Sequence, residues 1–171
     1  MGFGTVERVV LTYDTVWWGG GGIVYADDTG RFPVVVDFTA FTGAPTLIFI
    51  YGGPAAAAVQ ADLSDDEILA AARAVVLAAF GEDPEPAATA VSHWASDEYA
   101  RGAYTFASVD ASPADHTALA APVDDRVLFA GESTVDPAWT ATIPGAILSG
   151  LREARRLGVG PDLGIPGTEG H

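Results

Sequence analysis

The chain has 171 residues, an ordinary length for one domain, and its eight arginines, absent lysine and 23 acidic residues give a net charge of -15. A hydrophobic share of 49% with 18% charged residues is too apolar for a disordered chain. The acidic balance argues against nucleic-acid binding, which needs a basic surface. Because the sequence shows neither an apolar run of about 18 residues nor a recognisable leader, we expect no membrane span and a cytoplasmic location.

The first third of the chain predicts a mainly antiparallel sheet. β-branched and apolar runs typical of strands lie at residues 6–13, 23–25, 31–38 and 46–51. A turn-forming cluster at residues 27–30 joins the second and third of these runs into a hairpin.

The middle of the chain predicts a helix and a further strand. Ser64 and Glu67 have the spacing of a capping box, which predicts a helix that begins there and ends at Gly81. Residues 88–94 have the pattern of a strand.

The last third predicts irregular structure followed by one strand and one helix. Residues 97–117 are loop-rich, with a short helical turn that opens at Ser112. A buried strand is predicted at residues 126–130, a helix at 144–157 and a disordered tail at 158–171. Together the patterns indicate an α+β fold with a mixed, largely antiparallel sheet and flanking helices.

Side chains that usually carry chemistry are scarce. The chain has no cysteine, which excludes disulfides, thiolate nucleophiles and thiolate metal sites. The three histidines, His93, His116 and His171, lack the spacing of a helical zinc pair, and we expect no metal. Any redox or transfer chemistry would therefore come from a bound organic cofactor.

Four stretches, in order and spacing, resemble the flavin-containing amine oxidases, and most closely the polyamine oxidase and lysine-specific histone demethylase branch. They are GFGTVERVVL at 2–11, WASDEYARGAY at 94–104, LFAGEST at 128–134 and WTATIPGAILSGLREA at 139–154. The resemblance implies FAD as cofactor, and hydride transfer to it from the C–H bond next to an amine nitrogen. It also implies that residues 1–120 correspond to a substrate domain and residues 121–157 to the strand and helix that contact FAD.

The resemblance assigns residues to the cofactor. It places Gly131, Glu132 and the backbone of Thr142 and Ile143 against the flavin, with Trp94 as support nearby. Taken without the resemblance, Gly131 and Glu132 also fit an ordinary turn with a solvated glutamate. The helix at 144–157 likewise fits plain packing against a sheet.

Two aromatic residues and one arginine complete the candidate site. Tyr104 and Trp139 match substrate-facing positions of the family, although aromatic residues are more often part of a core. Arg8 stands where the family usually carries a lysine that holds a water near the flavin, so we take it as the candidate catalytic residue. The alternative is a surface arginine that pairs with Glu7 or another acid.

The glycine-rich fingerprint of a dinucleotide-binding domain, G-x-G-x-x-G, does not occur at the start of the chain, where Glu7 follows Gly2 and Gly4. We therefore expect two partners: a small-molecule amine, and a protein that supplies the dinucleotide-binding half. The alternative is a non-catalytic truncated relative, or a binding module that kept the substrate-domain fold.

Overall fold

The computed structural model describes residues 1–19, 21–25 and 30–159, and the chain forms two compact units. The sheet unit is Gly4–Ala103; the C-terminal unit joins Met1–Phe3 to the chain from Tyr104 onward. The units thus divide at residues 103 and 104, and the functional division predicted at residue 120 stays a prediction. Most of the predicted disordered tail, residues 160–171, lies outside the described residues.

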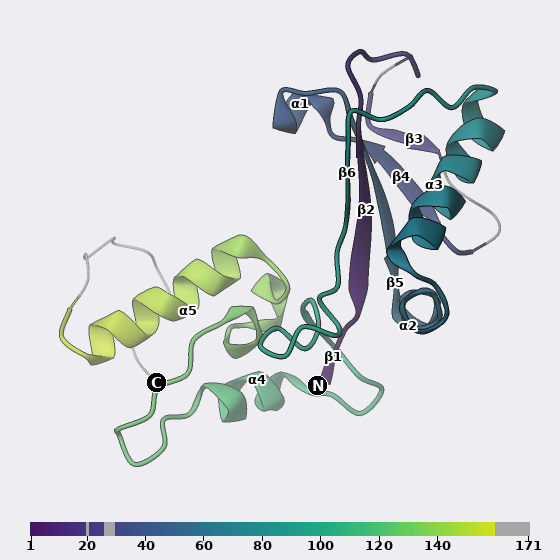
Figure 1. Cartoon of the computed structure of the whole chain (residues 1–171). Helices are drawn as coiled ribbons and strands as arrows, with labels where there is room; N and C mark the ends of the chain where they lie inside the picture. Colours follow the sequence, from purple (N-terminus) through teal and green to yellow (C-terminus); the bar gives the residue numbers. More distant parts are fainter. Residues whose placement is uncertain (20, 26–29, 160–171) are drawn as a thin grey trace. The chain divides into compact units, whose positions relative to one another are not determined.

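The sheet unit is built on five strands, and every neighbouring pair is antiparallel. They are β2 (Val6–Thr12), β3 (Ile23–Tyr25), β4 (Val34–Asp37), β5 (Thr46–Gly52) and β6 (Ala88–Val91), in the order β3-β4-β5-β2-β6 (Figure 1). The predicted sheet and its hairpin are confirmed, although residues 26–29 of the predicted turn lie outside the described residues. Strand β4 begins only at Val34 because Pro33 has no N–H for the ladder.

Two helices cover one face of this sheet, α2 (Gly53–Asp62) and α3 (Asp65–Phe80) (Figure 1). A third, α1 (Thr39–Thr42), is a single turn. Helix α3 begins at the predicted capping box and ends at Gly81 with φ 78°. Helix α2 is missing from the sequence prediction because its alanines give little apolar periodicity. The buried core combines Val9, Leu11, Leu47, Phe49 and Tyr51 of the strands with Ala56, Val59, Ile68, Ala72 and Val76 of the helices.

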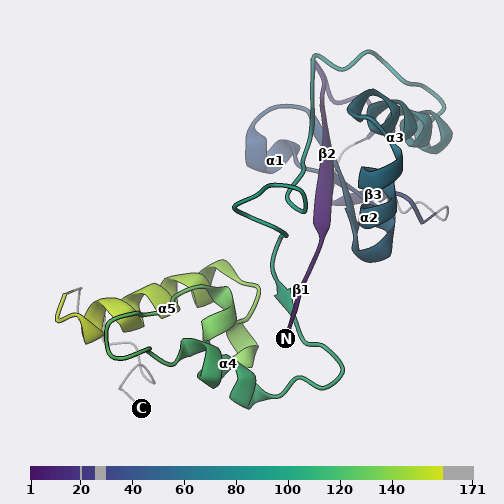
Figure 2. The same cartoon turned by 60° about the horizontal axis from the view of Figure 1, so that its bottom comes forward.

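Among its described residues, the C-terminal unit contains a short strand pair and two longer helices (Figure 2). Its elements are β1 (Gly2–Phe3) paired with β7 (Thr105–Phe106), α4 (Pro113–Ala120), the 3-10 turns η1 (Glu132–Thr134) and η2 (Pro137–Trp139), and α5 (Ile143–Arg156). The short helix after Ser112 and the last helix are confirmed, as is the α+β class. Within the described ranges, no helix is both long and apolar enough to cross a bilayer.

The strand predicted at residues 126–130 is wrong. This segment makes only an isolated bridge between Val123 and Val127, and the side chains of Val127 and Phe129 are half-exposed. A buried strand needs neighbours that pair its backbone groups. In the part of the chain that the structure describes, no strand runs beside this segment, so its apolar residues stay on the surface.

Helix α5 buries a stripe of small and polar residues, Gly145, Ser149 and Glu153, spaced four apart. A Cβ atom on Gly145 would overlap the Trp139 carbonyl oxygen and lie 3.1 Å from Val135 Cγ2. The helix therefore approaches the preceding turn more closely than any larger residue allows.

We predict opposite effects for two glycine substitutions in α5. Gly145→Ala forces the Trp139 turn to move and costs about 1–3 kcal/mol of the free energy of unfolding. Gly150→Ala, in the same helix with nothing within 4 Å of the added methyl, is the control and stabilises by about 0.5–1 kcal/mol. Denaturant unfolding of both variants measures the difference, and equal effects would contradict the close approach at Gly145.

Candidate functional site

The carboxylate of Glu132 connects three segments of the C-terminal unit. It accepts hydrogen bonds from the backbone N–H of Thr105 at 2.9 Å and from the Thr105 hydroxyl at 2.8 Å. It also accepts one from the N–H of Ala141 at 2.7 Å. One side chain in turn η1 thereby holds both strand β7 and Ala141, the residue before the N-cap of α5.

These bonds decide the charge state of Glu132. Burial would raise its pKa, but the hydrogen bonds from Thr105 and Ala141, together with nearby His116, outweigh burial and lower the pKa below its ordinary value. Glu132 is therefore an ionised acceptor at neutral pH.

The N-terminus of α5 lies directly after this junction. The hydroxyl of Thr142 caps the helix, accepting from the N–H of Gly145 at 3.0 Å and donating to the Trp139 carbonyl at 2.7 Å. The N–H of Ile143 has no acceptor among the described residues, and Pro144 has no N–H to offer. A free donor at the positive end of a helix suits an electron-rich ligand edge.

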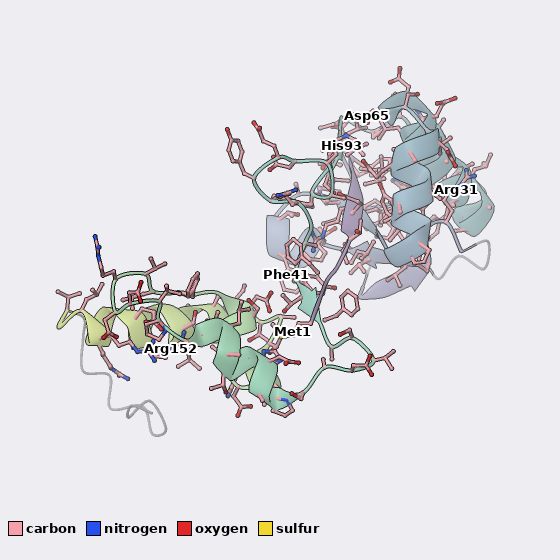
Figure 3. The ribbon with its side chains drawn as sticks, turned by 90° about the horizontal axis from the view of Figure 1, so that it is seen from below. Met1, Arg31, Phe41, Asp65, His93 and Arg152 are labelled. Carbon is pink, nitrogen blue, oxygen red and sulfur yellow. The ribbon has the colours of Figure 1, made fainter. Side chains whose placement is uncertain are left out.

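Helix α5 also fixes the turn that precedes Glu132. The N–H of Gly131, a residue with φ 143°, donates to the Ser149 hydroxyl at 2.8 Å. Arg152, labelled in Figure 3, donates to the carbonyl oxygens of Phe129, at 2.9 Å, and Thr134. Ser149 belongs to the small face of the helix that the sequence predicts for close packing, but its bond to Gly131 and those of Arg152 could not be predicted, because both residues lie far in sequence from the turn.

Tyr104 and Trp139 lie next to the residues that Glu132 holds. Tyr104 precedes Thr105, and Trp139 lies two residues before Ala141 in turn η2. Both rings are partly exposed, with 42% and 48% of their surface accessible, so neither is part of a core in the described structure.

Arg8 and Trp94 belong to the sheet unit. Arg8 is exposed on β2, whereas the neighbouring Glu7 points to the opposite, buried face. Glu7 bonds Ser92, Trp94 and Ala95 instead of Arg8, and no ion pair of Arg8 occurs in the described part of the chain. This excludes the pairing of Arg8 with Glu7. Trp94 is half-exposed, and sequence reasoning missed the part that Glu7 plays in holding it.

The residues present fit one part of a flavin dinucleotide and not another. The free N–H of Ile143 and the close backbone turn at Gly131 suit the edge of a flavin ring. Of the candidate site residues, Glu132 alone lines a surface depression of about 670 Å³ in the described part of the C-terminal unit. A pyrophosphate cradle requires a strand–turn–helix unit between parallel strands. All strand pairs among the described residues are antiparallel, so this part of a dinucleotide site is missing from them.

Replacing Glu132 tests the junction through its pH dependence. Because its folded pKa is lowered, its contribution is complete above the unfolded value near 4.5 and is lost as the pH falls through the folded pKa. Glu132→Gln should cost about 1–3 kcal/mol of the free energy of unfolding at pH 7, and this penalty should shrink below pH 4.5.

The measurement is denaturant unfolding across this pH range, with Glu82→Gln, at an exposed glutamate, as the matched control. The control should stay within about 0.5 kcal/mol of the parent protein. A Glu132→Gln penalty that does not change with pH would contradict an ionised, hydrogen-bonded carboxylate.

Similarity to known proteins covers nearly the whole chain. The family model for flavin containing amine oxidoreductase matches residues 1–158. A Drosophila melanogaster protein named possible lysine-specific histone demethylase 1 is 34% identical over 193 residues, covering 99% of this chain and 22% of that protein. Lysine-specific histone demethylase 1 homolog 3 of Arabidopsis thaliana is 34% identical over 165 residues, covering 92% of this chain and 10% of that protein.

Solved structures give the same fold. Cyclohexylamine oxidase from Brevibacterium oxydans IH-35A matches with a TM-score of 0.71 and 25% identity over 86% of this chain and 33% of that chain. Putrescine oxidase bound to putrescine matches with a TM-score of 0.68 and 24% identity over 90% of this chain and 34% of that chain. The chain thus spans about a third or less of the proteins it matches. It belongs to the family of flavin-containing amine oxidoreductases.

Proposed function

We propose that this chain carries the amine-facing and flavin-facing part of an FAD-dependent amine oxidase, completed by a separate dinucleotide-binding half. The observation that carries the proposal is the Glu132 junction, which joins the segments of Tyr104, Trp139 and the α5 N-terminus. Bound FAD would accept a hydride from the C–H bond next to the amine nitrogen. The chain would supply binding, orientation and electrostatics.

The residues of the C-terminal unit fit a positioning role. Gly131, Glu132, Thr142 and Ile143 would hold the flavin, since they combine a free backbone donor, an ionised acceptor and a glycine at an unusual φ. Because Glu132 and Thr142 are themselves fixed by hydrogen bonds, little reorganisation would accompany binding. In the sheet unit, Trp94 would support the flavin.

The substrate in this proposal is a small cationic amine. Tyr104 and Trp139 present partly exposed rings, which bind alkyl groups by packing and ammonium groups through their π faces. A net charge of -15 also favours the approach of a cation.

The proposed role of Arg8 concerns the reoxidation of the reduced flavin. The resemblance places Arg8 where a lysine is expected. Its exposed side chain forms no ion pair with an acid among the described residues. A guanidinium is larger than an ammonium and does not deprotonate. We therefore propose that Arg8 orders water near the flavin without matching the oxygen reactivity that lysine supports.

The outer face of α5 is the proposed docking surface for the dinucleotide-binding half. Because the helix buries Gly145, Ser149 and Glu153, its apolar residues face outward: Ile143 is 78% exposed and Ile147 57%. Exposed apolar faces mark interaction sites. Two observations support this choice of occupant: the absence of parallel strands among the described residues, and the two thirds of each of these solved amine oxidases that this chain does not cover.

A non-catalytic binding module is the second candidate. The observation that favours it is the missing pyrophosphate cradle in the described structure. Arg8, where the resemblance leads us to expect a lysine, points the same way. Flavin colour and amine-dependent bleaching separate the two functions, since a binding module retains neither.

We predict the effect of the aromatic residues on anaerobic flavin reduction by an amine, in the chain combined with a dinucleotide-binding half. Tyr104→Ala and Trp139→Ala should each slow bleaching roughly two- to thirty-fold, since a cation–π or packing face is worth about 0.5–2 kcal/mol. Tyr104→Phe keeps the ring and should have a mild effect. Tyr99→Ala, at a ring that is 87% exposed in the sheet unit, is the control. Site variants that retain flavin and bleach like the control would refute the aromatic site.

A further inference from the structure

Glu7 is a carboxylate with no exposed surface, placed near the start of β2, the strand beside the edge strand β6 of the five-stranded sheet. It lies on β2, on the face that also buries Val9 and Leu11. Removing a carboxylate from water is costly unless hydrogen bonds replace the lost solvation. Its partners therefore indicate what the residue is for.

All partners of Glu7 come from one segment that follows β6. Oε2 accepts from the Ser92 hydroxyl at 2.6 Å and from the Trp94 N–H at 3.1 Å. Oε1 accepts from the Ala95 N–H at 2.9 Å. These bonds turn the backbone away from the sheet after Val91, which is why the strand predicted over residues 88–94 ends there.

The same segment is held from a second side through His93. Its Nδ1 lies 2.5 Å from Gln60 Oε1, and its Nε2 lies 3.0 Å from Asp65 Oδ1 (Figure 3). Gln60 also donates to the Ser92 carbonyl at 3.2 Å. Hydrogen bonds at Ser92, His93 and Ala95 therefore hold the segment on both sides of Trp94. The Trp94 ring itself stays half-exposed.

Ser92 links this arrangement to Arg8. Its hydroxyl accepts from the Arg8 N–H at 2.7 Å while donating to Glu7, and its N–H donates to the Arg8 carbonyl at 2.9 Å. One buried carboxylate is thus connected to the backbones of Arg8 and Trp94.

We propose that Glu7 is a positioning residue, whose buried carboxylate fixes the backbone that carries Trp94 against the strand that carries Arg8. This inference deepens the proposed function and rests on it. Three donors converge on Glu7, and a carboxylate accepts all of them. Glutamine is the informative replacement, because its NH2 group would face a backbone N–H or the Ser92 hydroxyl.

The test uses the whole chain labelled with 5-fluorotryptophan, whose four tryptophans give four fluorine resonances. Glu7→Gln should shift the Trp94 resonance and speed amide exchange at Trp94 and Ala95 by roughly tenfold or more. The resonances of Trp17 and Trp18, in the core of the same unit, should stay in place, which a general loss of stability would not allow.

Glu153→Gln, at a buried carboxylate of the C-terminal unit, is the matched control and should leave the Trp94 resonance unchanged. If Glu7→Gln does not fold, Ser92→Ala is the second variant. It removes one of the three bonds to Glu7, together with the bond that the Ser92 hydroxyl accepts from the Arg8 N–H, and should shift the Trp94 resonance in the same direction. An unmoved Trp94 resonance with unchanged exchange, in whichever variant folds, overturns the proposal.

A double-mutant cycle in the flavin-loaded assembly separates positioning from a merely structural role. If Glu7 acts through Trp94, Glu7→Gln should slow flavin reduction several-fold in the parent but less than twofold in a Trp94→Ala background. Equal effects in both backgrounds overturn the proposal. A shifted Trp94 resonance in a protein that binds flavin but oxidises no amine supports the fixing of Trp94 and refutes the proposed function instead.

Discussion

The C-terminal unit depends on one ionised side chain, that of Glu132. Its carboxylate bonds Thr105, 27 residues earlier in the sequence, and Ala141, nine residues later. Without it, strand β7 and the N-terminus of α5 would share no common anchor at this point. A charged acceptor suits this task because hydrogen bonds to ionised groups are roughly twice as strong as neutral ones. Within the C-terminal unit, the proposed flavin and amine contacts all lie within two residues of Glu132, Thr105 or Ala141.

The sheet unit uses the same device. Glu7 holds the backbone around Trp94, as Glu132 holds the residues next to Tyr104 and Trp139. In each unit, a hydrogen-bonded carboxylate fixes the main chain near an aromatic ring that stays partly exposed. In the proposed function, the exposed aromatic faces and fixed backbone donors of this lysine- and cysteine-free chain would position a cofactor and a substrate without exchanging protons with them.

Short-range sequence patterns predict much of this fold, but they do not predict contacts between residues that are far apart in the sequence. The capping boxes at Ser64 and Ser112 mark helix starts correctly because their bonds span three residues. The resemblance singles out Glu132, but nothing in the sequence indicates that it bonds Thr105. The role of Glu7 is harder still to predict from the sequence, because its hydrogen-bond partners lie at least 85 residues away along the chain. The segment at 126–130 looks like a strand by composition, yet strand pairing depends on neighbours that the described residues do not provide.

The central claim is that the Glu132 turn and the N-terminus of α5 form a flavin-ring contact. Titration of the isotope-labelled chain with FMN, which has the ring and ribityl chain but no adenine half, tests it most directly by amide chemical shifts. We predict saturable shifts at Gly131, Ala141 and Ile143, and none in the core of helix α3. The absence of shifts up to the highest soluble FMN concentration, or shifts confined to the sheet unit, would contradict this flavin contact.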